Sequence, residues 1–283
     1  MPKHVINSTF LQRYTIEESG STWLFGPSAA ILNGDHGIYI DTPYVGNSIT
    51  FNGQIVSGED GIHIYAKDTS LTIGGIVIAE SIGVYIENVS APIRIEKSGV
   101  ISSTSFGVNA VGGVFDIVNQ GLVSSTENYT LNLQGALDGS VLRNGGKILS
   151  NSDAIEWGIE GADASTTIVN EKSGKIIAGA AAIYLSADTG QSLKVVNAGL
   201  IVGDAEGIDG NTGRETIFNS GRIVGAIWLE DDNDRLTNTG LVSGDIDLGD
   251  NDDRLINKGK IVCDEINLGA GADILDTRSG KII

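Results

Sequence analysis

A short phrase recurs about eleven times along this chain of 283 residues, and it constrains the fold more than any other feature. The phrase reads roughly apolar-x-apolar-Asn-x-Gly-x-Ile/Val-x-Gly/Ser, and successive pivot glycines lie 19 to 28 residues apart. The pivots are Gly53, Gly75, Gly99, Gly121, Gly146, Gly174, Gly199, Gly221, Gly240, Gly259 and Gly280. A repeat of this period is typical of a solenoid, in which each unit buries its apolar side only by stacking on its neighbours.

A second phrase, small-Ile-x-apolar, lies between copies of the first, as in Gly37-Ile38-Tyr39-Ile40 and Gly61-Ile62-His63-Ile64. Both phrases alternate with period two and are rich in β-branched residues, which indicates strands rather than helices. Glycine and asparagine separate them, so the chain turns after each short strand. We therefore expect an all-β fold, a single-stranded parallel β-helix of about 11 or 12 coils. We expect it to be right-handed, because parallel crossovers almost always are.

Asparagines occupy a fixed place in the first phrase, two residues before a pivot glycine. They are Asn119, Asn144, Asn197, Asn219, Asn238 and Asn257. Stacked on successive coils, their amides could hydrogen-bond to one another as a ladder along one corner. The alternative is that each asparagine satisfies the backbone of its own turn.

The repeat divides the chain into three stretches. Residues 1–30 lack the repeat, and we expect them to form an N-terminal cap, because a solenoid end exposes strand edge and core. We expect residues 31–225 to form coils of 22–28 residues, and residues 226–283 to form shorter, acidic coils. The last residues, Gly280–Ile283, stop within a repeat phrase, so we expect either a truncated sequence or further repeats in the same chain.

The acidic turns of residues 226–283 align with one another. Asp234, Asp253 and Asp273 take one position, and Leu236, Leu255 and Leu275 take the next apolar position. With Gly249, Gly269 and Gly271, these turns resemble the nonapeptide calcium repeats of secreted bacterial RTX proteins, although leucine replaces the first glycine and each coil has one such turn. The resemblance implies a bound Ca²⁺, for which Asp234, Asp250, Asp253 and Asp273 are the candidate ligands. The alternative is a solvated acidic turn that keeps this edge soluble.

Charge and composition exclude several classes of partner. The net charge of −18 disfavours nucleic acid and anionic membrane surfaces, which both require clustered Lys and Arg. No run of 18 apolar residues is present, so we expect no membrane insertion. The N-terminus does not read as a secretory signal. We still expect a secreted or cell-surface protein, which implies leaderless export or a sequence trimmed at its start.

Parallel β-helices include polysaccharide lyases, hydrolases and epimerases, which act through acids and bases on an outer face. The chain has three histidines and no catalytic motif that we can identify, so we assign no catalytic residues. One outward column is aromatic: Tyr39, His63 and Tyr85, with Tyr65 and Glu87 just beyond. Aromatic faces flanked by hydrogen-bonding groups can hold a polysaccharide or a cell-surface glycan. Alternatively, stacked aromatic side chains only stabilise the sheet face.

The first functional hypothesis is a non-enzymatic module for structure or adhesion. The repeat region resembles the β-helical stalks of large bacterial surface or secreted proteins, including adhesins, and calcium would stiffen its later coils. The second hypothesis is a β-helix protein that binds or processes a polysaccharide. A compact cluster of acids and bases on one face would distinguish the second from the first.

Overall fold

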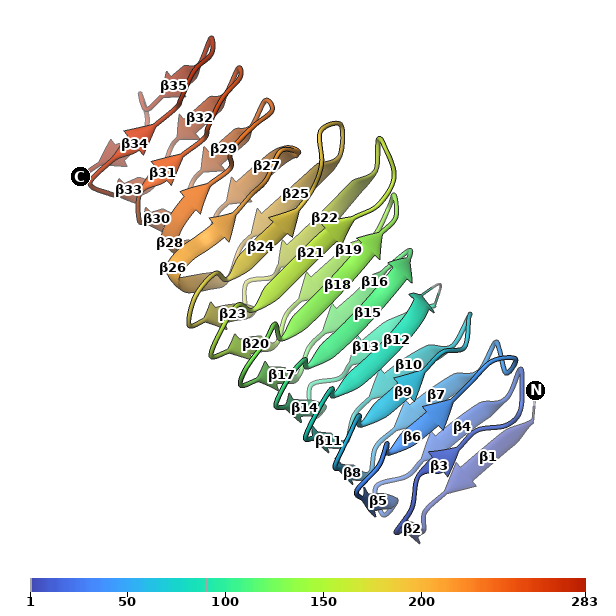
Figure 1. Ribbon diagram of the computed structural model, residues 1–283. Coiled ribbons are helices and arrows are strands. Elements are labelled where there is room, and N and C mark those ends of the chain that lie inside the picture. Colours follow the sequence, from blue (N-terminus) through green and yellow to red (C-terminus); the bar gives the residue numbers. More distant parts are fainter. Residues whose placement is uncertain (1, 90) are drawn as a thin grey trace.

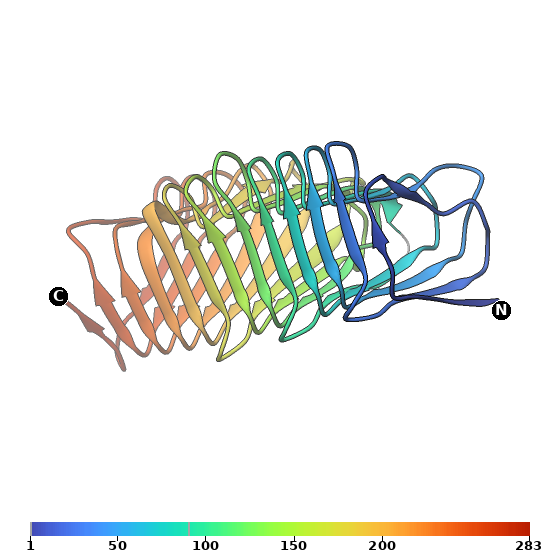
Figure 2. The ribbon, with the colours of Figure 1, turned by 90° about the horizontal axis from the view of Figure 1, so that it is seen from below.

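In a computed structural model, which describes residues 2–89 and 91–283, the chain is a parallel β-solenoid, as expected (Figures 1 and 2). The described residues form strands and turns and contain no helix. Each strand pairs in parallel with the equivalent strand of the next coil, so strands near the N-terminus lie at one end and those near the C-terminus at the other (Figure 1). The first column contains 13 strands, so the chain makes about twelve turns.

Each coil contributes one strand to each of three columns. The first column consists of β1 (Lys3–Ile6), β4 (Thr22–Phe25), β7 (Ser48–Phe51), β10 (Ser70–Ile73), β13 (Ile93–Ile95), β16 (Asp116–Asn119), β19 (Val141–Asn144), β22 (Ser165–Asn170), β25 (Ser192–Asn197), β27 (Arg214–Asn219), β29 (Arg235–Asn238), β32 (Arg254–Asn257) and β35 (Ile274–Asp276). The second consists of β2 (Thr9–Phe10), β5 (Ala30–Asn33), β8 (Gln54–Ser57), β11 (Ile76–Ala79), β14 (Val100–Ser103), β17 (Leu122–Ser125), β20 (Lys147–Ser150), β23 (Lys175–Ala178), β30 (Leu241–Ser243), β33 (Lys260–Val262) and β36 (Lys281–Ile282). The third consists of β3 (Tyr14–Thr15), β6 (Ile38–Ile40), β9 (Ile62–Ile64), β12 (Val84–Val89), β15 (Val108–Gly113), β18 (Leu131–Ala136), β21 (Ile155–Ile159), β24 (Ile183–Ser186), β31 (Ile246–Asp247) and β34 (Ile266–Asn267). Two longer strands, β26 (Leu200–Asp209) and β28 (Arg222–Trp228), run through both the second and the third columns.

The first residues already belong to the solenoid. Strand β1 pairs with β4, β2 with β5 and β3 with β6, each in parallel register with the coil that follows. The stretch that we expected as a cap therefore supplies the first coil, apart from residue 1, which lies outside the described residues. Its role as a cap stays a prediction.

The interior is one continuous apolar core. Alternate residues of every column point inward, and neighbouring coils place aliphatic side chains directly on one another. One such row is Ile31, Ile55, Val77, Ile101 and Val123, all of which are fully buried. Burial of a side chain of this size contributes about 1.5–3 kcal/mol, and each coil gains it only by contact with its neighbours.

The predicted asparagine ladder is present, and it is longer than expected. In each pair the Nδ2 of one asparagine donates to the Oδ1 of the next at 2.8–2.9 Å, and all the asparagines are buried. The ladder consists of Asn119, Asn144, Asn170, Asn197, Asn219, Asn238 and Asn257. We missed Asn170, because its turn is longer and it lies four residues before its pivot glycine rather than two.

The asparagine ladder starts where an apolar stack ends. On the coils before Asn119 the same inward position holds Phe25, Phe51, Ile73 and Ile95. Aromatic and aliphatic packing fills this corner in the first part of the rod, and a chain of side-chain hydrogen bonds fills it from Asn119 to Asn257. Buried amides are stable there because each one is satisfied by its neighbours.

The pivot glycines are required by close contact between coils. A Cβ atom added to Gly221 would lie 2.2 Å from the carbonyl oxygen of Gly199 on the preceding coil. Backbone atoms at such a distance leave no room for a side chain, which explains why the repeat keeps glycine there. The structure describes no helix that is long and apolar enough to cross a membrane.

Candidate functional site

The predicted aromatic column forms on the outer face of the third column of strands. Tyr39, His63 and Tyr85 are in register on β6, β9 and β12. The ring centroids of Tyr39 and His63 are 5.4 Å apart and those of His63 and Tyr85 are 4.6 Å apart, and both pairs are stacked. Tyr65 packs edge-on against His63 at 4.5 Å, and the Tyr85 hydroxyl donates to Glu87 Oε1 at 2.5 Å. The structure thus brings together all five residues of the predicted glycan site.

The rings of this aromatic column face one another rather than solvent. His63 is enclosed between two tyrosines and is only 7% exposed, whereas Tyr39, Tyr65 and Tyr85 are half-buried. Burial, together with the nearby Glu87 carboxylate, raises the pKa of Tyr85, so this hydroxyl stays protonated as a hydrogen-bond donor. A ligand on this face would meet ring edges, the tyrosine hydroxyls and the Glu87 carboxylate.

A buried carboxylate holds His63 from the corner that precedes its strand. His63 Nδ1 lies 2.6 Å from Asp60 Oδ2, and Asp60 Oδ1 accepts the N–H of Ile82 at 3.2 Å. Burial works to raise the pKa of Asp60, but the hydrogen bond and charge of His63 outweigh it and hold that pKa below its ordinary value. The other ring nitrogen of His63, Nε2, is buried and has no hydrogen-bond partner.

His36 completes this cluster from the neighbouring coil. Its Nδ1 lies 3.6 Å from Asp60 Oδ2, and its Nε2 lies 3.4 Å from Glu59 Oε2. His36, Asp60 and His63 can each offer one ligand atom so that all three atoms lie within 4.8 Å of one another. Of these three residues, only His63 was among the candidate site residues predicted from the sequence. Asp60 and His36 lie in corners, where strand alternation does not predict the direction of a side chain.

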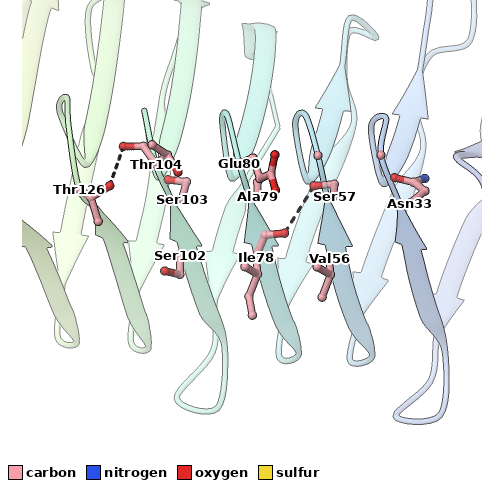
Figure 3. Close-up of a pocket in the computed structure, with 12 residues that line it drawn as sticks. Asn33, Val56, Ser57, Ile78, Ala79, Glu80, Ser102, Ser103, Thr104 and Thr126 are labelled. Atoms are coloured by element: carbon pink, nitrogen blue, oxygen red, sulfur yellow. Dashed lines mark hydrogen bonds between the residues drawn. The ribbon is translucent and has the colours of Figure 1, made fainter.

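A groove of about 500 Å³ runs along the second column on the other side of this corner (Figure 3). Small and hydroxyl-bearing side chains line it, including Ser57, Ser103 and Thr104, with apolar Val56 and Ile78 (Figure 3). Glu80 is the one ionisable residue among the described residues of its lining. A groove with a single carboxylate offers no acid–base pair for the chemistry of glycoside cleavage.

The predicted calcium ligands separate into two environments. Asp234 and Asp253 are buried and stack in register with Glu215 and the half-buried Asp273, and we call these four residues the acidic column. In contrast, Asp250 is exposed and lines an outer hollow of about 420 Å³ with Asp231 and Asp232. The structure therefore does not bring Asp250 together with the other three residues.

Within the acidic column each aspartate binds the backbone of the preceding coil. Asp234 Oδ1 accepts the N–H of Glu215 at 2.7 Å, Asp253 Oδ1 that of Asp234 at 2.8 Å, and Asp273 Oδ1 that of Asp253 at 2.9 Å. The second oxygens of Asp234 and Asp253, and both oxygens of Glu215, are buried without a partner. Among the described residues, no three carboxylates of these turns lie within 4.8 Å of one another.

Burial strongly perturbs these carboxyl groups. Desolvation, followed by the charges of Asp234, Asp232 and Glu230, raises the pKa of Glu215 to about 10. Desolvation likewise raises the pKa of Asp234 to about 9 and that of Asp253 to about 7. Sequence reasoning missed Glu215, although period-two alternation along β27 places it on the same inward face as Ile217.

The fold places this chain among the parallel β-solenoid repeat proteins. Comparisons with protein-family models, with curated proteins and with solved structures found no match. The chemistry of the described residues is therefore the guide to function.

Proposed function

We propose that this chain is a non-enzymatic structural module of a bacterial secreted or cell-surface protein, where it acts as a spacer and an adhesion surface. The observation that carries this proposal is the parallel stacking of its coils from one end to the other, in register apart from local shifts between β18 and β21 and between β26 and β28. Because each coil adds a fixed rise of about 4.8 Å, such a rod sets the distance between whatever lies at its two ends.

The surroundings of His63 support a role without catalysis. A general base must reach a substrate proton within hydrogen-bond distance, but His63 Nδ1 is bound to Asp60 and Nε2 is buried. We expect no cleavage when the protein is incubated with a panel of acidic polysaccharides. Turnover that is lost in His63→Ala and retained in His4→Ala would overturn this part of the proposal.

The location can be tested in the cell that carries the natural gene. Antibodies against the chain should label intact cells or detect it in the culture medium. Labelling that appears only after lysis, with a cytosolic protein as marker, would contradict a secreted or surface role.

We further propose that calcium stabilises the later coils through the acidic column. Support comes from the partnerless oxygens of Asp234 and Asp253, because stacked buried carboxylates repel one another unless a cation or a proton neutralises them. Millimolar Ca²⁺ should raise the melting temperature at pH 8, and less so in Asp253→Asn. If the melting temperature is the same with Ca²⁺ as with a chelator, or if Ca²⁺ raises it equally in Asp253→Asn, the acidic column does not bind calcium.

A second candidate function is glycan binding at the aromatic column. The specific observation in its favour is the set of tyrosines around His63, with the Glu87 carboxylate at the outer end. A glycan array should show signals that Tyr65→Ala and Glu87→Ala reduce. Binding that both variants leave unchanged would place the adhesive surface elsewhere.

A further inference from the structure

We propose that His36, Asp60 and His63 bind one divalent transition-metal ion, and that Zn²⁺ fits this ligand set best. The three side chains come from two adjacent coils and meet at the corner between the second and third columns. His63 is on β9, Asp60 is in the corner between β8 and β9, and His36 is in the equivalent corner one coil earlier. This cluster is far along the chain from the acidic turns discussed above.

The distances within the cluster are close to those of a metal site. Asp60 Oδ2 lies 2.6 Å from His63 Nδ1 and 3.6 Å from His36 Nδ1. Ligand atoms around a tetrahedral zinc ion, each about 2.0–2.1 Å from the metal, are about 3.3 Å apart. All three ligand atoms lie within 4.8 Å of one another, so small side-chain rotations would bring them to this spacing.

The chemistry of the three ligands selects the kind of ion. Two imidazoles and one carboxylate form a set that suits zinc, whereas calcium prefers six to eight oxygen atoms. A water molecule would take the fourth position. Binding would displace the proton that His63 Nδ1 shares with Asp60, since a coordinating nitrogen must be unprotonated.

The surroundings hold the ligands in position before a metal arrives. Asp60 Oδ1 is fixed by the Ile82 amide, which leaves Oδ2 directed at the histidines. His63 and Asp60 are 7% and 6% exposed, so the site excludes most solvent. Glu59 lies beside His36 Nε2 at 3.4 Å, as carboxylates that orient metal-binding histidines commonly do.

Among the described residues, the His63 ring has one hydrogen-bond partner, Asp60. Nε2 is buried without a partner, so the Asp60 contact alone anchors the ring through hydrogen bonding. The Asp60 N–H to His36 Nδ1 bond is long, at 3.3 Å, and would give way to the metal. Zn²⁺ held by Asp60 and His63 of one coil and by His36 of the coil before it would join these two coils to each other.

The test is a zinc titration of the metal-stripped chain of 283 residues against a chromophoric chelator, with metal content measured by mass spectrometry. The wild type should bind one Zn²⁺ per chain with micromolar or tighter affinity. Asp60→Asn and His36→Gln should each weaken binding at least tenfold. His4→Ala is the matched control, because His4 is the third histidine and has one carboxylate neighbour, Glu18, at 2.9 Å.

Two further measurements establish whether the zinc is held by this cluster. Co²⁺ should give the visible absorption of a four-coordinate N/O site, and His36→Gln should abolish it. Zinc should also raise the melting temperature of the wild type but not of His36→Gln, which should itself fold because its position is only half-buried. Equal affinity in all variants, loss in His4→Ala, or displacement of zinc by equimolar Ca²⁺ would overturn the proposal.

Discussion

At the scale of single residues, the most unusual side chain is Glu215, an acidic residue in the apolar core. It is fully buried on an inward position where the preceding coil has Leu193, and both of its carboxyl oxygens lack a partner. Burial raises its pKa from 4.5 to about 10, so the folded chain keeps a proton that the unfolded chain releases. Stability contributed by this proton is present below about pH 4.5 and is lost as the pH rises toward 10.

We therefore expect the free energy of unfolding, measured without divalent cations, to fall between pH 5 and pH 9. Glu215→Gln should reduce the slope by up to about 1.4 kcal/mol per pH unit, and it should raise stability at pH 8. Urea unfolding at several pH values measures this. Exposed Glu127→Gln is the control and should leave the slope unchanged. An unaltered slope in Glu215→Gln would show that this carboxyl group ionises freely.

A second residue, Glu230, has a backbone conformation that favours glycine. Its φ is 66°, and the equivalent turns of the next two coils have Gly249 at 82° and Gly269 at 72°. Glu230→Gly should stabilise the protein by about 1 kcal/mol, since non-glycine residues are strained in the left-handed region. Thermal unfolding measures the gain, and Glu230→Gln separates it from the effect of removing a charge. A gain in Glu230→Gln equal to that in Glu230→Gly would show that charge, and not backbone strain, limits stability here.

The sequence predicted some residues of the candidate sites and not others, for a physical reason. Tyr39, His63 and Tyr85 follow from strand alternation, because the side-chain direction in a strand has period two. Asp60 and His36 lie in corners, where the direction depends on turn geometry and on the coil beneath. Glu215 did follow the alternation, but a glutamate in the core contradicts the usual preference of charged residues for solvent.

At the scale of elements, the asparagine ladder is the main polar support of the later coils. Asn197 accepts from Asn170 at 2.8 Å and donates to Asn219 at 2.8 Å, and it also binds the N–H of Gly199 and the carbonyl of Arg222. Each of these partners is in or next to the buried corner. Loss of one member leaves several buried groups unsatisfied at once.

Asn197→Ala should therefore lower the free energy of unfolding by on the order of 3 kcal/mol. The control is Asn132→Ala, because Asn132 also donates to an asparagine of a neighbouring coil, at 3.2 Å, but on the half-buried outer face. Its loss should be below about 1 kcal/mol. Equal losses in the two variants, measured by urea unfolding, would mean that the buried ladder adds nothing beyond one ordinary hydrogen bond.

The existence of the ladder could be predicted from the sequence, but its full length could not. Asparagine at a fixed offset from a glycine was visible in six copies, whereas Asn170 was hidden by the longer turn before Gly174. Loop length varies freely at a solenoid corner, because only the strands must stay in register. The spacing of the sequence repeat therefore predicts which residues form the strands better than it predicts which residues occupy equivalent places in the turns.

At the scale of the whole molecule, the coils act as units that are added along one axis. Each coil contacts its neighbours through the same three columns, and the asparagine ladder continues across coils of different length. A period in the sequence predicts this architecture directly, because every coil buries equivalent apolar residues against its two neighbours. What the rod spaces or presents depends on surface chemistry, which the repeat does not constrain.

The central claim is that each coil adds a fixed length to the rod, and removal of one coil tests this claim most directly. Deletion of residues 198–219 joins Asn197 to Ser220-Gly221 and so preserves the repeat phrase. Spin labels at Gln54→Cys and Lys260→Cys, with Cys263→Ser, occupy two exposed positions of one outward-facing row, nine coil steps apart. Double electron–electron resonance measures the distance between the two labels. At about 4.8 Å per step, the distance distribution should be narrow and centred near 43 Å in the undeleted chain, and near 38 Å after the deletion. An unchanged distance, a broad distribution or a deletion variant that does not fold would contradict the claim.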